Sequence, residues 1–342
     1  YLKMFLKKGY VVKFIGDNYL HEEPYTSTLQ QMGIEVLYGQ EYLTGIWDWL
    51  VKNGKDIHVA YLNRPHIATK YVDFIKEHTD IKMIYYGHDL HFMREFREYE
   101  LTGDVKKRQE SEYWKSIEFS LFHKVAVSYY PSYVEEEAIH AVDETIPVKA
   151  ITAYVYEEFL QNLNKDFAKR EGLLFVGGFA HPPNADAVLW FAKEVFPKIR
   201  EQIKVNFYIV GSKVTDEIKA LEQPGNGIIV KGFVSEEELA DLYRNCRIVV
   251  VPLRYGAGVK GKVVEAIYNG APIVTTSVGS EGIPDVEKVL LVKDQPDEFA
   301  ETVVEFYKDE KRLEDLAEKT QVYIREHFSI DAAWDVIKED FE

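Results

Sequence analysis

Residues 250–267 read VVPLRYGAGVKGKVVEAI, and this run is the most informative stretch of the chain. The apolar residues up to Pro252 predict the end of a buried strand, and the three glycines that follow predict a loop. A helix is expected to begin near Gly261 or Lys262. The order strand, glycine-rich loop, helix is typical of α/β domains that bind ligands at the carboxyl ends of their strands.

The same run predicts a binding site for an anion. Glycines allow close backbone approach, and a helix start offers unpaired amides at the positive end of its dipole. Arg254, Lys260 and Lys262 add three cations within nine residues, in a chain whose formal charge is −16. These features favour a phosphate or pyrophosphate over the alternative, a glycine-rich turn with solvated cations. Glu265 follows one turn into the helix, where its carboxylate can accept hydrogen bonds from a ribose.

The run matches neither of two common phosphate-binding motifs. It lacks the Gly-Lys-Ser/Thr sequence of a Walker loop, and Gly256-Ala257-Gly258 lacks the third glycine of the dinucleotide fingerprint. A dehydrogenase is therefore disfavoured.

Outside this run, short β-branched segments alternate with longer helical ones over nearly the whole chain. This alternation predicts parallel sheets covered by helices on both faces, that is, a doubly wound α/β fold. The expected strands are 11–15, 34–37, 57–62, 81–86, 124–128, 148–152, 173–176, 205–210, 228–230, 247–251, 272–276 and 289–292. The expected helices are 64–78, 104–122, 184–203, 236–245, 298–307 and 331–341.

The length of 342 residues predicts two domains, and the polar segment 157–172 (EEFLQNLNKDFAKREG) separates two complete series of strands and helices. The negative charge argues against nucleic acid as a partner. The single cysteine, Cys246, excludes an intrachain disulfide and fits a reducing cytoplasm. Neither a membrane-spanning segment nor a signal peptide is expected, because the longest apolar runs are far shorter than about 20 residues.

Two segments of the second half resemble a known family. From Arg254 to Ile283 the sequence reads RYGAGVKGKVVEAIYNGAPIVTTSVGSEGI, which resembles the donor-binding signature of retaining family-4 glycosyltransferases (glycosyl transferases group 1). Residues 173–191, LLFVGGFAHPPNADAVLWF, resemble the first strand and helix of their donor domain. Together with the helix after Gly232-Phe233-Val234, the resemblance covers residues 173–283.

The resemblance implies the GT-B fold, in which two doubly wound, Rossmann-like domains face a central cleft. Residues 1–160 would form an acceptor-binding domain and residues 171–327 a nucleotide-sugar-binding domain. Residues 328–342 would form a helix that packs back on the first domain. The segment Lys8-Gly9-Tyr10-Val11-Val12 resembles the residues that follow the first helix of such domains, so the first strand and its glycine-rich loop are expected to be missing from this N-terminal domain.

The resemblance also implies roles for individual residues. Arg254 and Lys262 would hold the donor's diphosphate, with Lys260 assisting, and Glu265 would bind the ribose. The diphosphate would also approach the backbone of Gly177, Gly178, Gly256 and Gly258, and the base would lie against Phe233 and Val234.

This sequence departs from the family pattern at two places. Ala257 stands where many members have a glutamate that contacts the transferred sugar. Residues 178–181, Gly-Phe-Ala-His, replace the arginine and lysine that many members carry after the first strand of this domain. The phosphate-binding role is therefore expected to fall on Arg254, Lys260 and Lys262.

In the first half, the expected strand 81–86 leads into the sequence GHDLHFMR, which ends at Arg94. A histidine at this position resembles the family's histidine that contacts the donor sugar. That role is assigned to His88, with His91 as its rival. Asp89, Arg94 and Arg97 would orient the histidines or bind the acceptor.

The expected activity is retaining transfer of a sugar from a nucleoside-diphosphate sugar, with no other cofactor, to a glycan or lipid-linked acceptor. His88, His91, Arg254 and Lys262 are the candidate catalytic residues, and no metal is required because cations would stabilise the leaving diphosphate. Such an enzyme would serve bacterial polysaccharide or glycoconjugate synthesis, in the cytoplasm or at the inner face of the membrane. The alternatives are a nucleotide-sugar-binding module without turnover and a nucleotide-sugar 2-epimerase on the same fold.

Overall fold

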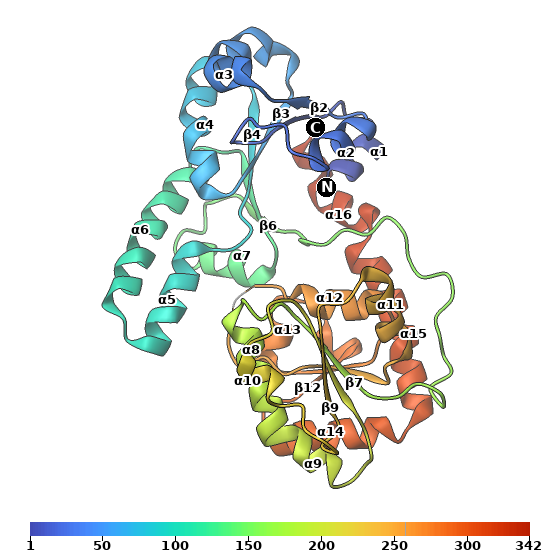
Figure 1. Ribbon diagram of the computed structural model, residues 1–342. Coiled ribbons are helices and arrows are strands. Elements are labelled where there is room, and N and C mark those ends of the chain that lie inside the picture. The colour runs from blue at the N-terminus through green and yellow to red at the C-terminus, as the bar shows by residue number, and fades with distance from the viewer. Residues whose placement is uncertain (257) are drawn as a thin grey trace. The chain divides into compact units, whose positions relative to one another are not determined.

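The computed structural model describes residues 1–256 and 258–342, which divide into two compact units (Figure 1). The first unit comprises Tyr1–Val155 together with Ala333–Glu342, and the second comprises Tyr156–Ala332. The described helices include none that is both long and apolar enough to cross a membrane.

In the second unit, six described strands form one parallel sheet in the order β12-β11-β10-β7-β8-β9. From β7 the chain adds β8 and β9 on one side, and it then adds β10, β11 and β12 on the other side of β7. The carboxyl ends of β7 and β10 therefore form the topological switch point, where doubly wound sheets bind ligands. The strands are β7 (Leu173–Val176), β8 (Phe207–Val210), β9 (Ile228–Gly232), β10 (Ile248–Val251), β11 (Ile273–Thr275) and β12 (Leu290–Val292).

Helices cover this sheet, which explains why its central strands are apolar at every position. All four residues of β10 are buried, and Val249 lies opposite both Leu174 and Ile273. The helices of the unit are α8 (Pro182–Trp190), α9 (Phe196–Arg200), α10 (Asp216–Lys219), α11 (Glu236–Asn245), α12 (Gly261–Tyr268), α13 (Ser277–Ser280), α14 (Pro296–Tyr307) and α15 (Glu310–Phe328). Helix α16 (Ile330–Ile337) begins in this unit and ends in the first.

The stretch 184–203, expected as one helix, is divided by a π-helical turn at Phe191–Val195. This turn immediately precedes α9, in which Pro197 has no amide hydrogen to donate to the preceding turn. The wider turn accommodates the missing hydrogen bond.

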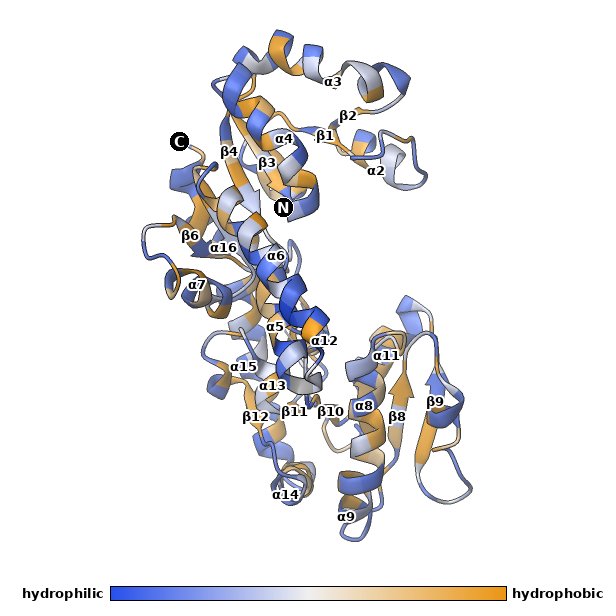
Figure 2. Ribbon diagram, turned by 90° about the vertical axis from the view of Figure 1, so that its left-hand side faces the viewer, coloured by the Kyte–Doolittle hydropathy of each residue, from blue (hydrophilic) through white to orange (hydrophobic). Residues whose placement is uncertain are grey.

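In the first unit, β3 to β6 form a parallel sheet in chain order, while β1 and β2 form a separate parallel pair. In Figure 2, strands of this unit such as β4 have hydrophobic colours, whereas α6 is mainly hydrophilic. The strands are β1 (Lys13–Ile15), β2 (Glu35–Leu37), β3 (Val59–Asn63), β4 (Lys82–Tyr86), β5 (Val127–Tyr130) and β6 (Val148–Ala150). The helices are α1 (Leu2–Lys7), α2 (Tyr25–Gln31), α3 (Gln40–Asn53), α4 (Pro65–His78), α5 (His91–Thr102), α6 (Val105–Phe122) and α7 (Tyr133–His140).

The last residues of the chain complete the first unit. The Asp340 carboxylate accepts hydrogen bonds from the Tyr129 hydroxyl and from Nζ of Lys149, both at 2.7 Å. The Phe341 ring packs against Phe5, with 5.0 Å between the ring centres.

Each expected strand overlaps a strand of the structure, which confirms the doubly wound α/β fold class. The expected helices are present too, but several others were not foreseen. The most consequential is α5, because residues 91–102 are helical and no helix was expected there. Arg94 and Arg97 therefore lie on a helix.

Candidate functional site

The glycine-rich run of the second unit lies at the topological switch point of its sheet. The loop that begins at Pro252 leaves the carboxyl end of β10, and Gly177 and Gly178 follow the carboxyl end of the adjacent β7. A Cβ atom at position 256 would lie 3.7 Å from Cε of Lys260 and 4.0 Å from Cγ of Pro183, so this loop also reaches the start of α8. The expected glycines thus gather at one edge of the sheet.

Helix α12 points its amino terminus at this edge. It begins at Gly261, and no side chain of the described residues caps its first amides. Val263 and Val264 donate to the carbonyl of Lys260, which leaves the amides of Gly261 and Lys262 outside this hydrogen-bonding pattern. Free amides at the positive end of a helix dipole suit an anion.

Lys262 extends from the first turn of α12 toward the loop after β7. Its Nζ donates a hydrogen bond to Oδ1 of Asn184 at 2.7 Å. A Cβ at position 177 would lie 3.2 Å from Cε of Lys262. Burial, followed by the charge of Lys260, lowers the pKa of Lys262 to about 8. The ammonium is therefore available to a ligand near neutral pH.

Lys260 is almost fully buried, with 9% of its surface exposed. Its Nζ donates to the carbonyl of Gly258 and lies 3.4 Å from Oε2 of Glu281, which directly follows α13. Lys260 thus holds together two loops at the edge of the site. A ligand would have to compete with Glu281 for this cation.

Arg254 is also paired in the structure. Its guanidinium makes a two-point contact with the Asp186 carboxylate of α8, including an Nε to Oδ2 hydrogen bond of 2.9 Å. This hydrogen bond, with the charge of Asp186, raises the pKa of Arg254. Because the side chain is about half exposed, a change of rotamer can exchange Asp186 for a phosphate.

Glu265 lies one turn into α12 and is partly buried. Burial raises the pKa of its carboxyl group, and the nearby Tyr243 hydroxyl opposes that rise. The expected base-binding residues Phe233 and Val234 follow β9 and precede α11, and Phe233 is 81% exposed. Ala257, where many family members have a sugar-binding glutamate, lies outside the described residues.

Three partners in this site were missed from the sequence. Asn184 contacts Lys262, which lies 78 residues away in the sequence, and Asp186 contacts Arg254, which lies 68 residues away. Glu281 contacts Lys260, which lies 21 residues away. From the sequence alone, Asn184 stands at the start of an expected helix, 184–203, and no role in binding is expected of it. Its position directly after the Gly177-Gly178 loop was the signal that could have found Asn184.

The first unit brings its own predicted residues together at the carboxyl end of β4. The His91 Nδ1 atom lies 3.3 Å from Oε1 of Glu118, a carboxylate of α6 with no exposed surface. Glu118 also accepts hydrogen bonds from the backbone amides of His91 and Phe92, at 2.9 and 3.1 Å. It therefore fixes both the start of α5 and the His91 ring.

The two histidines differ in their protonation. Burial lowers the pKa of His91, but the Glu118 hydrogen bond and the charges of Asp89 and Glu118 outweigh it and raise the net value. Burial, followed by the charge of Arg64, lowers the pKa of the more exposed His88. His91 is thus the more readily protonated of the two histidines, and His88 the more readily neutral.

The two arginines of this cluster lie on α5. Arg94 is bound to Asp89, and its Nε and Nη2 atoms donate to Oε1 of Glu95 at 3.1 and 2.9 Å. Arg97 lies one turn further along the helix and is partly exposed.

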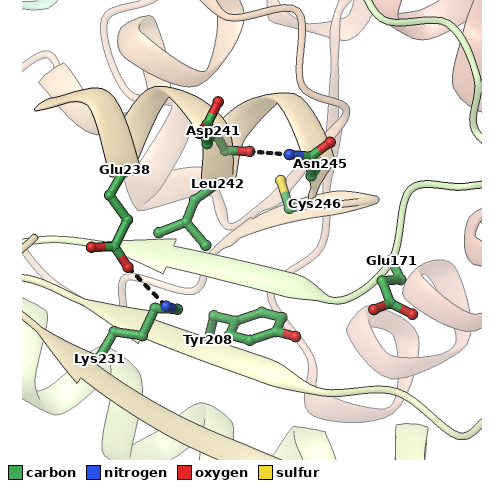
Figure 3. A pocket seen from close by; sticks show the side chains of 8 residues that line it. All are labelled: Glu171, Tyr208, Lys231, Glu238, Asp241, Leu242, Asn245 and Cys246. Atoms are coloured by element: carbon green, nitrogen blue, oxygen red, sulfur yellow. Dashed lines mark hydrogen bonds and ion pairs between the residues drawn. The ribbon is translucent and has the colours of Figure 1, made fainter. Parts of the chain in front are cut away.

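A separate pocket of about 210 Å³ lies between α11 and the strands β8 and β9 (Figure 3). Its lining includes the carboxylates of Glu171, Glu238 and Asp241, and its one lysine, Lys231, is paired with Glu238 at 2.8 Å. This acidic lining is unsuited to a phosphate, so the pocket is distinct from the site at the switch point.

The second unit of the chain is similar to a known protein family. Residues 170–309 match the family model described as glycosyl transferases group 1. An uncharacterized 44.6 kDa protein in the cps region of Klebsiella pneumoniae is 29% identical over 184 residues, which are 51% of this chain and 45% of that protein. The resemblance to group 1 glycosyltransferases is therefore confirmed.

Solved structures with the same fold include TarM and HepE. TarM gives a TM-score of 0.66 at 13% identity, over 86% of this chain and 57% of that one. HepE of Anabaena, in complex with UDP, gives a TM-score of 0.67 at 13% identity, over 97% of this chain and 99% of that one. The chain thus has the GT-B fold, and it spans only about half the length of the Klebsiella protein and of TarM.

Proposed function

We propose that this chain is a retaining glycosyltransferase that transfers a sugar from a nucleoside-diphosphate sugar to a hydroxyl group of a glycan or lipid-linked acceptor. The observation that carries the proposal is the cationic edge at the switch point, where Lys262, in the first turn of α12, reaches the Gly177-Gly178 loop, and where no side chain of the described residues caps this helix. The match of residues 170–309 to group 1 glycosyltransferases supports it, as do the UDP complexes of the structural relatives TarM and HepE. The relative from a cps region supports a role in bacterial polysaccharide synthesis.

In the proposed reaction, the bond between the sugar's anomeric carbon and the diphosphate oxygen breaks as the acceptor oxygen bonds to that carbon from the same face. The acceptor's proton passes to an oxygen of the leaving diphosphate. Lys262, the amides of α12 and Arg254 (once released from Asp186) would stabilise the negative charge that develops on the diphosphate. Glu265 would bind the ribose, and Phe233 and Val234 the base.

The cluster at the end of β4 is proposed to act on the sugar and acceptor. His88, as the less readily protonated histidine, would contact the transferred sugar, and His91, Asp89, Arg94 and Arg97 would orient it or bind the acceptor. Because protein cations would balance the diphosphate charge, we propose that no divalent metal is needed.

A donor panel tests the proposal. UDP-, GDP-, dTDP- and CDP-sugars are incubated with the protein and an oligosaccharide acceptor mixture, with and without EDTA, and products are followed by mass spectrometry. We expect release of one nucleoside diphosphate coupled to a glycosylated product, with the anomeric configuration of the donor kept and the rate unchanged by EDTA. Binding without turnover, or formation of an epimer of the donor, would overturn transfer, and inhibition by EDTA would overturn metal independence.

The pKa of Lys262 predicts how diphosphate binding depends on pH. With a pKa of about 8, the ammonium is charged at pH 7 and largely neutral at pH 9, whereas an ordinary lysine stays charged to about pH 10. The affinity for UDP is therefore expected to fall as pH rises through about 8, because the phosphates themselves stay ionised in this range. The dissociation constant, measured calorimetrically from pH 7 to 9.5 at constant ionic strength, checks this.

The matched control for this pH dependence is Lys262→Arg, since a guanidinium stays charged throughout the range. The fall in affinity should be absent from this variant. If the UDP affinity of the wild-type protein is as independent of pH as that of Lys262→Arg, the assignment of Lys262 to the diphosphate is contradicted.

A further inference from the structure

One carboxamide connects the two loops of the proposed donor site. Asn184, in the first turn of α8, is 95% buried, since only 5% of its surface is exposed. Its Oδ1 accepts the hydrogen bond from Nζ of Lys262, and its Nδ2 donates to the carbonyl oxygen of Gly178, each at 2.7 Å. A single side chain thus links the loop after β7 to the first turn of α12.

The two hydrogen bonds require an amide in one orientation. The carbonyl oxygen must face the ammonium of Lys262, and the NH₂ group must face the carbonyl of Gly178, because only these pairings join a donor to an acceptor. A carboxylate at position 184 would place an oxygen against the carbonyl of Gly178 and lose that hydrogen bond. The contact is therefore specific for a neutral amide.

The neutrality of Asn184 distinguishes Lys262 from the other two cations of the site. Arg254 is paired with Asp186 and Lys260 with Glu281, but no carboxylate of the described residues lies within ion-pairing distance of Lys262. The titratable groups that face it are themselves basic. They are Lys260, which precedes α12, and His181, the residue before α8, whose pKa is lowered by burial and by the charges of both lysines.

We propose that Asn184 is a positioning residue that directs the Lys262 ammonium toward the phosphates of the ligand while leaving its charge uncompensated. This inference rests on the proposed function, because it takes the ligand to be a nucleoside diphosphate. It adds that the Lys262 ammonium, which meets the diphosphate, is held by an uncharged partner, so Lys262 does not have to leave an ion pair when the ligand binds.

The substitution Asn184→Asp tests the proposal with almost no change in shape. The new carboxylate would pair with Lys262 and repel the diphosphate, so the affinity for UDP at pH 7 is expected to fall about ten- to a hundredfold. The ion pair would also raise the pKa of Lys262 and move the pH dependence of UDP binding toward higher pH. Unchanged UDP affinity in a folded Asn184→Asp protein would overturn the proposal.

A measurement without nucleotide separates this inference from the proposed function. Competitive acetylation, followed by mass spectrometry of the peptide that carries Lys262, reports the pKa of this amine in the free protein. Asn184→Asp should raise it, and an unchanged value would overturn the role of Asn184 whatever the ligand. A wild-type protein that binds none of UDP, GDP, dTDP and CDP would instead overturn the proposed function.

Two further variants keep the test interpretable. Asn184→Ser keeps a neutral residue at this position, but the serine side chain is too short to reach Lys262. The affinity for UDP should therefore fall, while the decline in that affinity as pH rises through about 8 should remain.

Asn226→Asp is the matched control, because the Asn226 carboxamide also joins backbone groups, donating to Leu221 at 2.7 Å and accepting from Ile228 at 3.0 Å. It lies between α10 and β9, and its substitution should leave UDP affinity unchanged. Equal losses in both aspartate variants would overturn a specific role for Asn184.

Discussion

Replacing Lys262 by alanine is expected to lower the affinity for the nucleoside diphosphate by about 10- to 150-fold. The change removes a charge-assisted hydrogen bond, which is worth about 1.5–3 kcal/mol. The rate of transfer should fall further than the affinity, by about a hundredfold or more, because the diphosphate gains negative charge as it leaves. A thermal-shift titration with UDP, GDP, dTDP and CDP checks the loss, since a ligand that binds only the native state raises the melting temperature.

The fold of the Lys262→Ala protein should remain intact. The native environment disfavours the charged form of this side chain, and relief of that cost offsets the loss of the hydrogen bond to Asn184, so the melting temperature without ligand is expected to change little. Lys231→Ala is the matched control, because Lys231 belongs to the same unit but pairs with Glu238 in the acidic pocket (Figure 3). A nucleotide-induced shift that survives in Lys262→Ala would place the diphosphate elsewhere.

Gly211→Ala is expected to be the most destabilising of the single substitutions considered, by about 3 kcal/mol or more. Gly211 follows β8 with a φ of +154°, and a Cβ atom there would lie 1.9 Å from the carbonyl oxygen of Gly177. Neither atom belongs to a flexible side chain, so the clash can be relieved only by moving the backbone. The displaced segment would be the Gly177-Gly178 loop, so nucleotide binding should be lost together with stability.

The control for Gly211→Ala is Gly225→Ala. Gly225 also has a positive φ, of +79°, but a Cβ atom there would have no neighbour within 4 Å. Its substitution should cost only the conformational strain, about 1–2 kcal/mol, and leave nucleotide binding intact. Melting temperatures of both variants, with and without UDP, provide the measurement. Equal losses would show that the contact with Gly177 has no effect of its own.

The sequence was most informative where local chemistry determines structure. Strands such as β10 are continuous β-branched runs because helices cover both faces of the sheet, and the glycine-rich run after it ends where α12 begins. The family resemblance over residues 173–283 then specified the fold more finely than periodicity alone.

Several helices of the structure, among them α5 and α15, were not predicted from the sequence. Helix α5 begins at His91 because Glu118, 27 residues further on, accepts its first amides, and no neighbouring residue announces that contact. Helix α15 did carry a signal, since Leu313, Leu316, Ala317 and Thr320 form a buried stripe at helical spacing.

The partners of the site cations could not be inferred from spacing. Asp186 and Asn184 lie on α8, whereas Arg254 and Lys262 belong to the loop and helix after β10. The pairs meet only because β7 and β10 are neighbours in the sheet although 71 residues lie between them. The sequence indicated which single residues can bind an anion, but it could not indicate which residues contact them. The contacts of Arg254 with Asp186 and of Lys262 with Asn184 depend on the order of strands in the sheet.

The division of the first unit between the two ends of the chain has a consequence for biosynthesis. Residues 1–155 leave the ribosome before residues 156–332, but Tyr129 and Lys149 cannot gain their partner Asp340 until residues 156–332 have also been made. The second unit, whose residues are contiguous, can fold while translation continues. During synthesis the second unit is thus expected to reach its native state before the first unit does. Until then, Phe5 lacks its contact with Phe341 in the nascent polypeptide.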